Sequence, residues 1–168
     1  MRKRYLIPII FTILFSYWWT HRWKYIVIHH SAGGYGNIEF LQKVHRERQG
    51  KDPIDAIPYH YIVGNGNGLG IGVVKSDFRQ GWNLWGMHVS KNNVDRNFRG
   101  LGICLIGNFE QKHIAEKQYV ALVKLTKELM KKHNIPVANV SGHGYTKGES
   151  TKCPGKHFPM QRFLQDIR

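Results

Sequence analysis

The chain has 168 residues, a length typical of a single domain. Its 25 Lys and Arg residues outnumber its 11 Asp and Glu residues, and the resulting net charge of +14 predicts a polyanionic partner. A hydrophobic content of 42% is enough for a core and excludes a disordered basic tail. Two cysteines exclude a disulfide-rich scaffold and a four-cysteine zinc finger.

The N-terminal segment differs in composition from the rest of the chain. After a basic start at residues 2–4, an uncharged run extends from Tyr5 to Thr20. As a helix it would span about 24 Å, against a hydrocarbon core of about 30 Å. Arg22 and Lys24 could lengthen it by reaching the headgroups. No small-x-small cleavage site follows Ser16, which favours an uncleaved signal anchor over a signal peptide or a buried helix.

We therefore expect residues 1–22 to anchor the protein in the membrane and residues 23–168 to form the functional domain. The basic cluster at the start favours a cytoplasmic N-terminus, which would place the domain on the periplasmic or cell-wall side. A cleaved signal peptide and a secreted domain are the alternative. Without residues 1–20 the chain keeps 22 Lys and Arg residues against 11 acids, so the domain itself is basic.

The remaining chain alternates strand-like and helix-like patterns. In chain order, the predicted elements are a strand at Trp23–Ile28, a helix at Ile38–Arg48 ended by Gln49–Pro53, strands at Tyr59–Val63, Leu69–Val74 and Leu101–Ile106, a helix at Glu116–His133, a short strand or extended segment at Val137–Val140 and a helix at Met160–Ile167. The turn sequence Asn65–Gly68 predicts an antiparallel hairpin. Strands interleaved with helices predict an α/β fold with a central mixed sheet flanked by helices.

Three places carry residues suited to chemistry. His29 and His30 close a buried strand beside a glycine-rich loop, His143 follows an extended segment, and Cys153 lies ten residues further on. Two imidazoles and a thiolate with an open fourth position make a catalytic-type zinc set. Spacing alone is also compatible with loop histidines and an ordinary buried cysteine, because neither a His-Glu-x-x-His nor a Cys-x-x-Cys motif occurs.

Six segments resemble, in the same order, the motifs of one family. They are Tyr25–Ala32, Pro58–Val63 with its Asn-Gly turn, Gly86–His88 with Asn93, Leu101–Gly107, Ser141–His143, and Cys153–Gly155 with Phe158-Pro159. The chain from residue 25 to residue 159 thus resembles the zinc-dependent N-acetylmuramoyl-L-alanine amidases, which include phage lysozyme-type amidases and peptidoglycan recognition proteins. The resemblance implies their fold and the hydrolysis of the amide between N-acetylmuramic acid and L-alanine in peptidoglycan.

The resemblance also assigns roles to individual residues. It implies one zinc ion held by His29, His143 and Cys153, with His29 chosen over His30 by its family position. It implies catalytic roles for Tyr59 and Thr151, with Lys152 as an alternative, and substrate-binding roles for His30, His88 and Asn93. Zinc would polarise the carbonyl and activate water, while hydroxyl groups donate to the oxyanion.

Two positions depart from parts of the family. Thr151 stands where phage and intracellular amidases carry a catalytic lysine, as it does in catalytic recognition proteins. Cys104 stands where intracellular recycling amidases carry a catalytic glutamate, and we expect it to be an inert buried thiol. These departures leave no evident carboxylate base and increase the importance of Tyr59.

Two alternative functions, a non-catalytic peptidoglycan-binding module and a nucleic-acid-binding domain, can each be compared with the amidase by one feature of the sequence. A non-catalytic peptidoglycan-binding module often lacks the third ligand, which is present here as Cys153. A nucleic-acid partner is not expected, because no nucleic-acid-binding motif accompanies the charge. We expect Phe78, Trp82 and Trp85 to pack in the core rather than stack on sugars. We expect a monomer, while the stem-peptide type and the choice between phage lysis and wall remodelling stay open.

Overall fold

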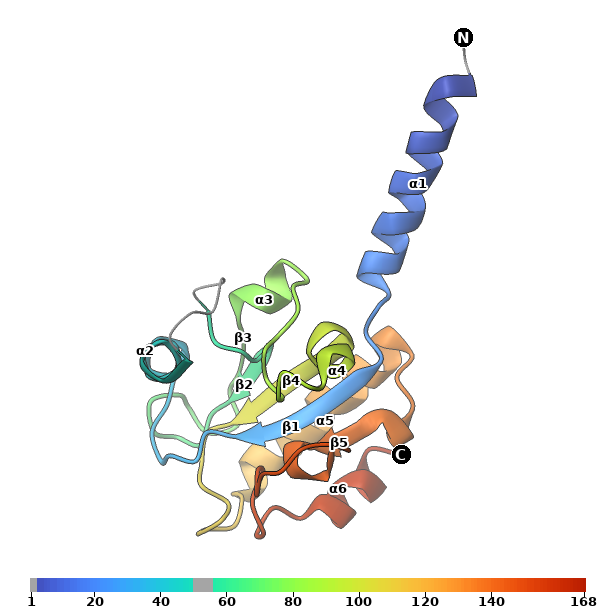
Figure 1. Ribbon diagram of the computed structural model, residues 1–168. Coiled ribbons are helices and arrows are strands. Elements are labelled where there is room, and N and C mark those ends of the chain that lie inside the picture. The colour runs from blue at the N-terminus through green and yellow to red at the C-terminus, as the bar shows by residue number, and fades with distance from the viewer. Residues whose placement is uncertain (1–2, 50–55) are drawn as a thin grey trace.

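A five-stranded mixed sheet lies at the centre of the computed structural model, which describes residues 3–49 and 56–168. Its strands are β1 (Tyr25–His30), β2 (Tyr61–Val63), β3 (Val74–Ser76), β4 (Gly100–Leu105) and β5 (Val140–Gly142), in the spatial order β3-β2-β4-β1-β5. β1 pairs in parallel with β4 and β5, β2 in parallel with β4, and β3 antiparallel with β2. The predicted mixed sheet is confirmed (Figure 1).

Helices cover both faces of this sheet. The helices of the described residues are α1 (Lys3–Thr20), α2 (Ile38–Gln49), α3 (Phe78–Gly81), α4 (Val94–Arg99), α5 (Glu116–His133) and α6 (Met160–Asp166), with 3-10 turns η1 (Val137–Asn139) and η2 (His143–Tyr145). Leu101, Ile103 and Leu105 of β4 pack in the core shared with α5 and α6, whereas Cys104 packs with Leu41 of α2. The alternation along β4 therefore assigns α2 and α5 to opposite faces.

Several element boundaries differ from the predictions. The helix at Glu116–His133 is confirmed with its predicted bounds. The strand predicted at Leu69–Val74 is wrong over most of its length, because a long loop, closed by the Gly64 N–H donating to the Val73 carbonyl at 2.9 Å, precedes β3. The predicted strand at Val137–Val140 is mostly the 3-10 turn η1. The predicted helix end after Gln49 lies outside the described residues.

Helix α1 projects from the domain (Figure 1), and its apolar side chains, such as Phe11 and Leu14, are exposed. Among the helices of the described residues, none is long and apolar enough to cross a membrane. The spanning anchor expected at residues 1–22 therefore lacks support.

Arg22 joins α1 to the domain. Its side chain is only 2% exposed, and its guanidinium lies 4.1 Å from the Trp19 ring centroid and 4.0 Å from that of Trp23. It donates hydrogen bonds to the carbonyls of Trp19, Phe98 and Asn83 at 2.6–3.0 Å. The expectation that Arg22 extends towards lipid headgroups is wrong, because its charge is buried against backbone carbonyls inside the fold.

Candidate metal centre

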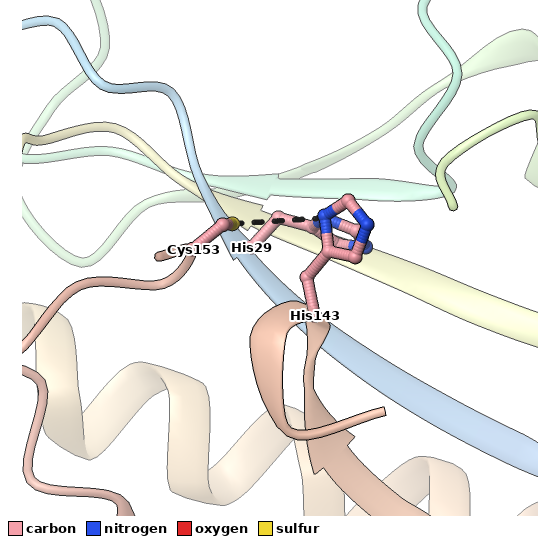
Figure 2. A group of neighbouring side chains, drawn as sticks. All are labelled: His29, His143 and Cys153. Atoms are coloured by element: carbon pink, nitrogen blue, oxygen red, sulfur yellow. Dashed lines mark hydrogen bonds between the residues drawn. The ribbon is translucent and has the colours of Figure 1, made fainter. Parts of the chain in front are cut away.

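The sheet brings two histidines from distant parts of the chain together. His29 lies near the end of β1, and His143 follows β5, the parallel neighbour of β1. Parallel strands end at the same edge, so the two imidazole centroids lie 4.7 Å apart. Cys153 approaches from the loop that follows η2, and one ligand atom from each of the three side chains lies within 4.8 Å of the others (Figure 2).

Strand alternation in the folded sheet distinguishes His29 from His30. The Nδ1 atom of His29 lies 3.9 Å from Cys153 Sγ. The ring of His30 turns the other way and accepts a hydrogen bond from the Phe109 N–H at 3.2 Å. His30 still lines the cavity, and its backbone N–H donates to Cys153 Sγ at 3.3 Å. His29 is therefore the imidazole that faces the other two candidate ligands.

A chain of hydrogen bonds runs beneath His29. Its Nε2 atom lies 3.1 Å from His88 Nδ1, and His88 Nε2 lies 3.2 Å from the Gly100 carbonyl oxygen. Burial, reinforced by neighbouring histidines, lowers the pKa of His29 well below its usual value. Burial also lowers the pKa of His88 to about 4. Both rings are therefore neutral at pH 7, the form in which imidazole binds metals.

His143 is held by Glu149, a residue that the sequence analysis did not select. His143 Nε2 lies 3.0 Å from Glu149 Oε2, and the Glu149 side chain is only 4% exposed. Burial would raise the pKa of Glu149, but hydrogen bonds from Ser90, Asn93 and His143 outweigh it and lower the pKa. One sequence signal could have found Glu149: it is the only acidic residue between Glu128 and Asp166.

Cys153 completes a donor set of two imidazoles and one thiol. Burial raises the pKa of Cys153 to about 12 when no cation is present. This donor set is typical of catalytic zinc sites, which keep a fourth position open. Tetrahedral zinc with bonds of about 2.0–2.3 Å needs ligand atoms about 3.5 Å apart. The 3.9 Å between His29 Nδ1 and Cys153 Sγ is close to that separation, so the residues fit zinc.

The three side chains line a cavity of about 340 Å³, of which α2 forms one wall through residues such as Leu41 and Arg48. Tyr59 also lines it, with its ring centroid 5.0 Å from that of His29. Burial raises the pKa of Tyr59 well above its usual value, so its hydroxyl stays a proton donor at neutral pH. Among the residues that the structure describes, no carboxylate lines this cavity.

The other predicted site residues divide into two groups. Thr151 lines the cavity, and its Oγ1 accepts the Cys153 N–H at 3.2 Å, whereas Lys152 is exposed and outside the lining. His88 lines the cavity but is buried against His29. Asn93 is not part of the lining and donates to Glu149 and to the Lys147 carbonyl. The structure thus places Asn93 behind the metal centre.

The aromatic residues near α3 do not behave as expected. Trp82 is 68% exposed and Phe78 is 51% exposed, and their ring centroids lie 6.0 Å apart. The expectation of core packing is wrong for Phe78 on α3 and for Trp82 just after it, because both side chains are exposed to solvent. Trp85 is half-buried, with its ring centroid 6.4 Å from that of Phe98. None of these rings lines the cavity of the candidate metal centre.

Comparisons with known proteins agree with this architecture. Among solved structures, the chain is similar to the N-acetylmuramoyl-L-alanine amidase LysC from Clostridium intestinale URNW, with 23% identity, a TM-score of 0.72, and coverage of 89% of this chain and 87% of that one. It is also similar to bumblebee PGRP-SA, with 24% identity, a TM-score of 0.63, and coverage of 84% and 80%. These likenesses show that the fold is shared.

Drosophila PGRP-LB has the same fold, with 23% identity, a TM-score of 0.59, and coverage of 81% of this chain and 82% of that one.

No curated protein matches the sequence. The family model described as N-acetylmuramoyl-L-alanine amidase matches residues 19–156, which is more than half of the chain and includes all three candidate ligands. The chain therefore belongs to the N-acetylmuramoyl-L-alanine amidase family.

Proposed function

We propose that the protein is a zinc-dependent enzyme that hydrolyses the amide between N-acetylmuramic acid and L-alanine in peptidoglycan. The observation that carries this proposal is the convergence of His29, His143 and Cys153 at an open cavity that Tyr59 also lines. A set of three protein ligands is the usual composition of a catalytic zinc site rather than a structural one. Family membership supplies the bond and the substrate class.

His29, His143 and Cys153 would hold the zinc ion. Bound there, zinc would supply Lewis acidity towards the amide carbonyl and the activation of a water molecule. The protonated Tyr59 hydroxyl donates to the oxygen on which negative charge develops. Thr151 Oγ1 accepts the Cys153 N–H, which leaves the hydroxyl proton of Thr151 free to act as a second donor. We assign no catalytic role to Lys152, because it lies outside the cavity lining.

The ligand assignment is tested by Cys153→Ala, with Cys104→Ala as its matched control. Cys104 is fully buried in the core between the sheet and α2, so its loss leaves the donor set intact. We expect wild type and Cys104→Ala to contain about one zinc ion per chain by metal analysis. We expect Cys153→Ala to lose the metal and to release no stem peptide from purified sacculi, as followed by mass analysis.

The same digestion separates the enzyme from the binding module. Release of intact stem peptides beginning with L-alanine identifies the proposed bond. Sacculus binding by the zinc-loaded protein without any release would instead identify a non-catalytic recognition module. A wild-type protein that takes up no zinc would overturn the metal assignment.

We also propose that the domain works on the cell-wall side of the membrane, where peptidoglycan lies. The apolar side chains of α1 are exposed, and burying them away from water is favourable. This supports a segment that either inserts into the membrane or is removed by proteolytic processing. Protease added to spheroplasts should degrade the domain from outside, and the mass of the mature chain distinguishes a retained α1 from a released one. Protection of the domain from that protease would contradict this placement.

A further inference from the structure

Residues 88–93 form hydrogen bonds behind two of the candidate ligands, directly with His29 and through Glu149 with His143. His88 lies under His29, and Ser90 and Asn93 donate to Glu149, which in turn accepts from His143. The resemblance to the amidase family implies substrate-binding roles for His88 and Asn93. His88 lines the cavity, but these three side chains make polar contacts with His29 and Glu149.

The hydrogen bonds beneath His29 determine where its proton lies. The Gly100 carbonyl oxygen can only accept, so His88 Nε2 carries the proton in that bond. Neutral His88 therefore presents Nδ1 as an acceptor, and the His29 Nε2–H must donate to it. This leaves His29 Nδ1, which faces Cys153, with a free lone pair.

Glu149 determines the proton position on His143 in the same way. Its carboxylate accepts the Ser90 Oγ–H at 2.7 Å and the Ser90 N–H at 3.2 Å, and Asn93 Nδ2 also donates to it. A carboxylate surrounded by donors is an acceptor only, so His143 Nε2 carries a proton and donates it to Oε2 at 3.0 Å. His143 Nδ1 is then the free nitrogen.

The segment is itself held rigidly. The side chain of Asn97 on α4 accepts the Val89 N–H at 3.0 Å and donates to the carbonyls of Val89 and Ser90. On the other side, a Cβ atom at Gly102 of β4 would lie only 2.8 Å from His88 Cγ. The His88 ring therefore fits against β4 because residue 102 has no side chain.

We propose that residues 88–93 form an orienting segment for the metal centre. His88 fixes the Nε2–H tautomer of His29, and Glu149, held by Ser90 and Asn93, fixes that of His143. Both histidines would then present Nδ1 to one metal ion. Because each ring already has the required tautomer, no change of tautomer is needed when the ion binds. His88 and Glu149 are positioning residues, which act through the ligands. This inference rests on the proposed zinc site and not on the amidase reaction.

The tautomers are tested first in the wild-type protein without metal. Long-range ¹H–¹⁵N correlation spectra of histidine-labelled protein distinguish the Nδ1–H and Nε2–H forms. We expect His29 and His143 both to be in the Nε2–H form before zinc is added. A dominant Nδ1–H form at either residue overturns the proposal, and this measurement needs no variant that has to fold.

Zinc affinity tests the positioning roles. By competition with a chromogenic chelator, Glu149→Ala and His88→Ala should each weaken zinc binding about 10–100-fold. Glu149→Gln should fall between wild type and Glu149→Ala, because its amide oxygen still accepts from His143 but carries no charge. Glu116→Gln is the matched control, since Glu116 is exposed and pairs with Arg162 on the surface. It should keep the wild-type affinity.

An unchanged zinc affinity in Glu149→Ala, with circular dichroism showing a native fold, overturns the role of Glu149. Activity separates this inference from the proposed function. If the wild-type protein shows the expected tautomers and binds zinc but releases no stem peptide, the orienting segment stands and the proposed amidase activity is overturned. If the wild-type enzyme is active but all the variants retain wild-type zinc affinity, the amidase activity stands and the orienting segment is overturned.

Discussion

Tyr59 and Tyr61 lie two residues apart, one just before β2 and one within it, yet they have different environments. Tyr59 packs in the core cluster that contains Leu41 of α2 and lines the cavity beside His29. Tyr61 belongs to the larger cluster formed with α5 and α6. The pair therefore offers a tyrosine that touches the reacting region and a matched one that does not.

We expect Tyr59→Phe to lower kcat for release of stem peptide about 10²–10³-fold, because one donor to the developing oxyanion is lost. Its zinc content should stay at the wild-type level, since Tyr59 is not a ligand. Tyr61→Phe should retain wild-type kcat. Equal rates for Tyr59→Phe and wild type would exclude the hydroxyl from the reaction.

At the scale of elements, the site is assembled by the parallel pairing of β5 with β1. The pairing of Ile28 with Gly142 puts His29 and His143 next to each other at the strand ends, although 113 residues separate them in sequence. η2 then turns the chain so that the loop carrying Cys153 returns over β1. Short strands suffice, because β1 and β5 have only to place His29 and His143 at their ends, while Cys153, the third candidate ligand, comes from a loop.

The junction between α1 and the domain rests on Arg22. Burial lowers the pKa of Arg22 to about 10, so the side chain is still charged at pH 7 and is satisfied by three carbonyls. Arg22→Met should reduce the free energy of unfolding by about 2–4 kcal/mol, because the Phe98 and Asn83 carbonyls lose this donor, whereas the Trp19 carbonyl keeps the Asn83 amide as a donor. Urea denaturation measures this loss.

Lys24→Met is the control for that experiment, since Lys24 is exposed and only two residues away. It should change the free energy of unfolding by less than about 0.5 kcal/mol. A stability of Arg22→Met equal to that of Lys24→Met would show that α1 is not fixed to the domain through this side chain.

For the whole molecule, a buried histidine makes stability depend on pH. His60 is fully buried, donates from Nε2 to the Leu84 carbonyl at 2.9 Å, and accepts the Gly102 N–H at Nδ1 at 3.0 Å. Burial, reinforced by the positive charges of Arg79 and Arg22, lowers the pKa of His60 well below 6.5. The folded protein therefore holds this ring neutral.

The unfolded chain binds a proton at His60 below about pH 6.5 and the folded protein does not, so stability falls as the pH falls. We expect the free energy of unfolding, measured by urea denaturation with a chelator present, to decrease from pH 7 to pH 5. Each such histidine contributes a slope of about 1.4 kcal/mol per pH unit. A free energy that stays constant or increases over this range would contradict the assignment.

The basic surface also acts at the scale of the whole molecule. With residues 1–20 set aside, the domain keeps a charge of +11, and we propose that this charge favours contact with the carboxylates of cell-wall stem peptides. Such long-range attraction weakens as salt screens it, so it assists encounter rather than the choice of bond.

Much of the fold followed from the sequence alone, and the metal donor set followed from the resemblance of its motifs to the amidase family. Apolar β-branched runs predict the strands β1 and β4, and a long amphipathic pattern predicts α5, because these signals are local and repeat along the chain. His29, His143 and Cys153 were predicted from ordered motifs, and the structure brings their ligand atoms together.

Only the tertiary structure decided the supporting contacts. Glu149 belongs to no motif of the sequence analysis, and its role depends on Ser90 and Asn93, which are more than 50 residues away in sequence. The sequence likewise did not predict that Arg22 is buried and that Trp82 is exposed. The hydropathy of a side chain does not indicate which carbonyls or rings will surround it in the fold. Local patterns determine the elements, whereas contacts between distant segments determine which ring nitrogen of His29 and of His143 is hydrogen-bonded.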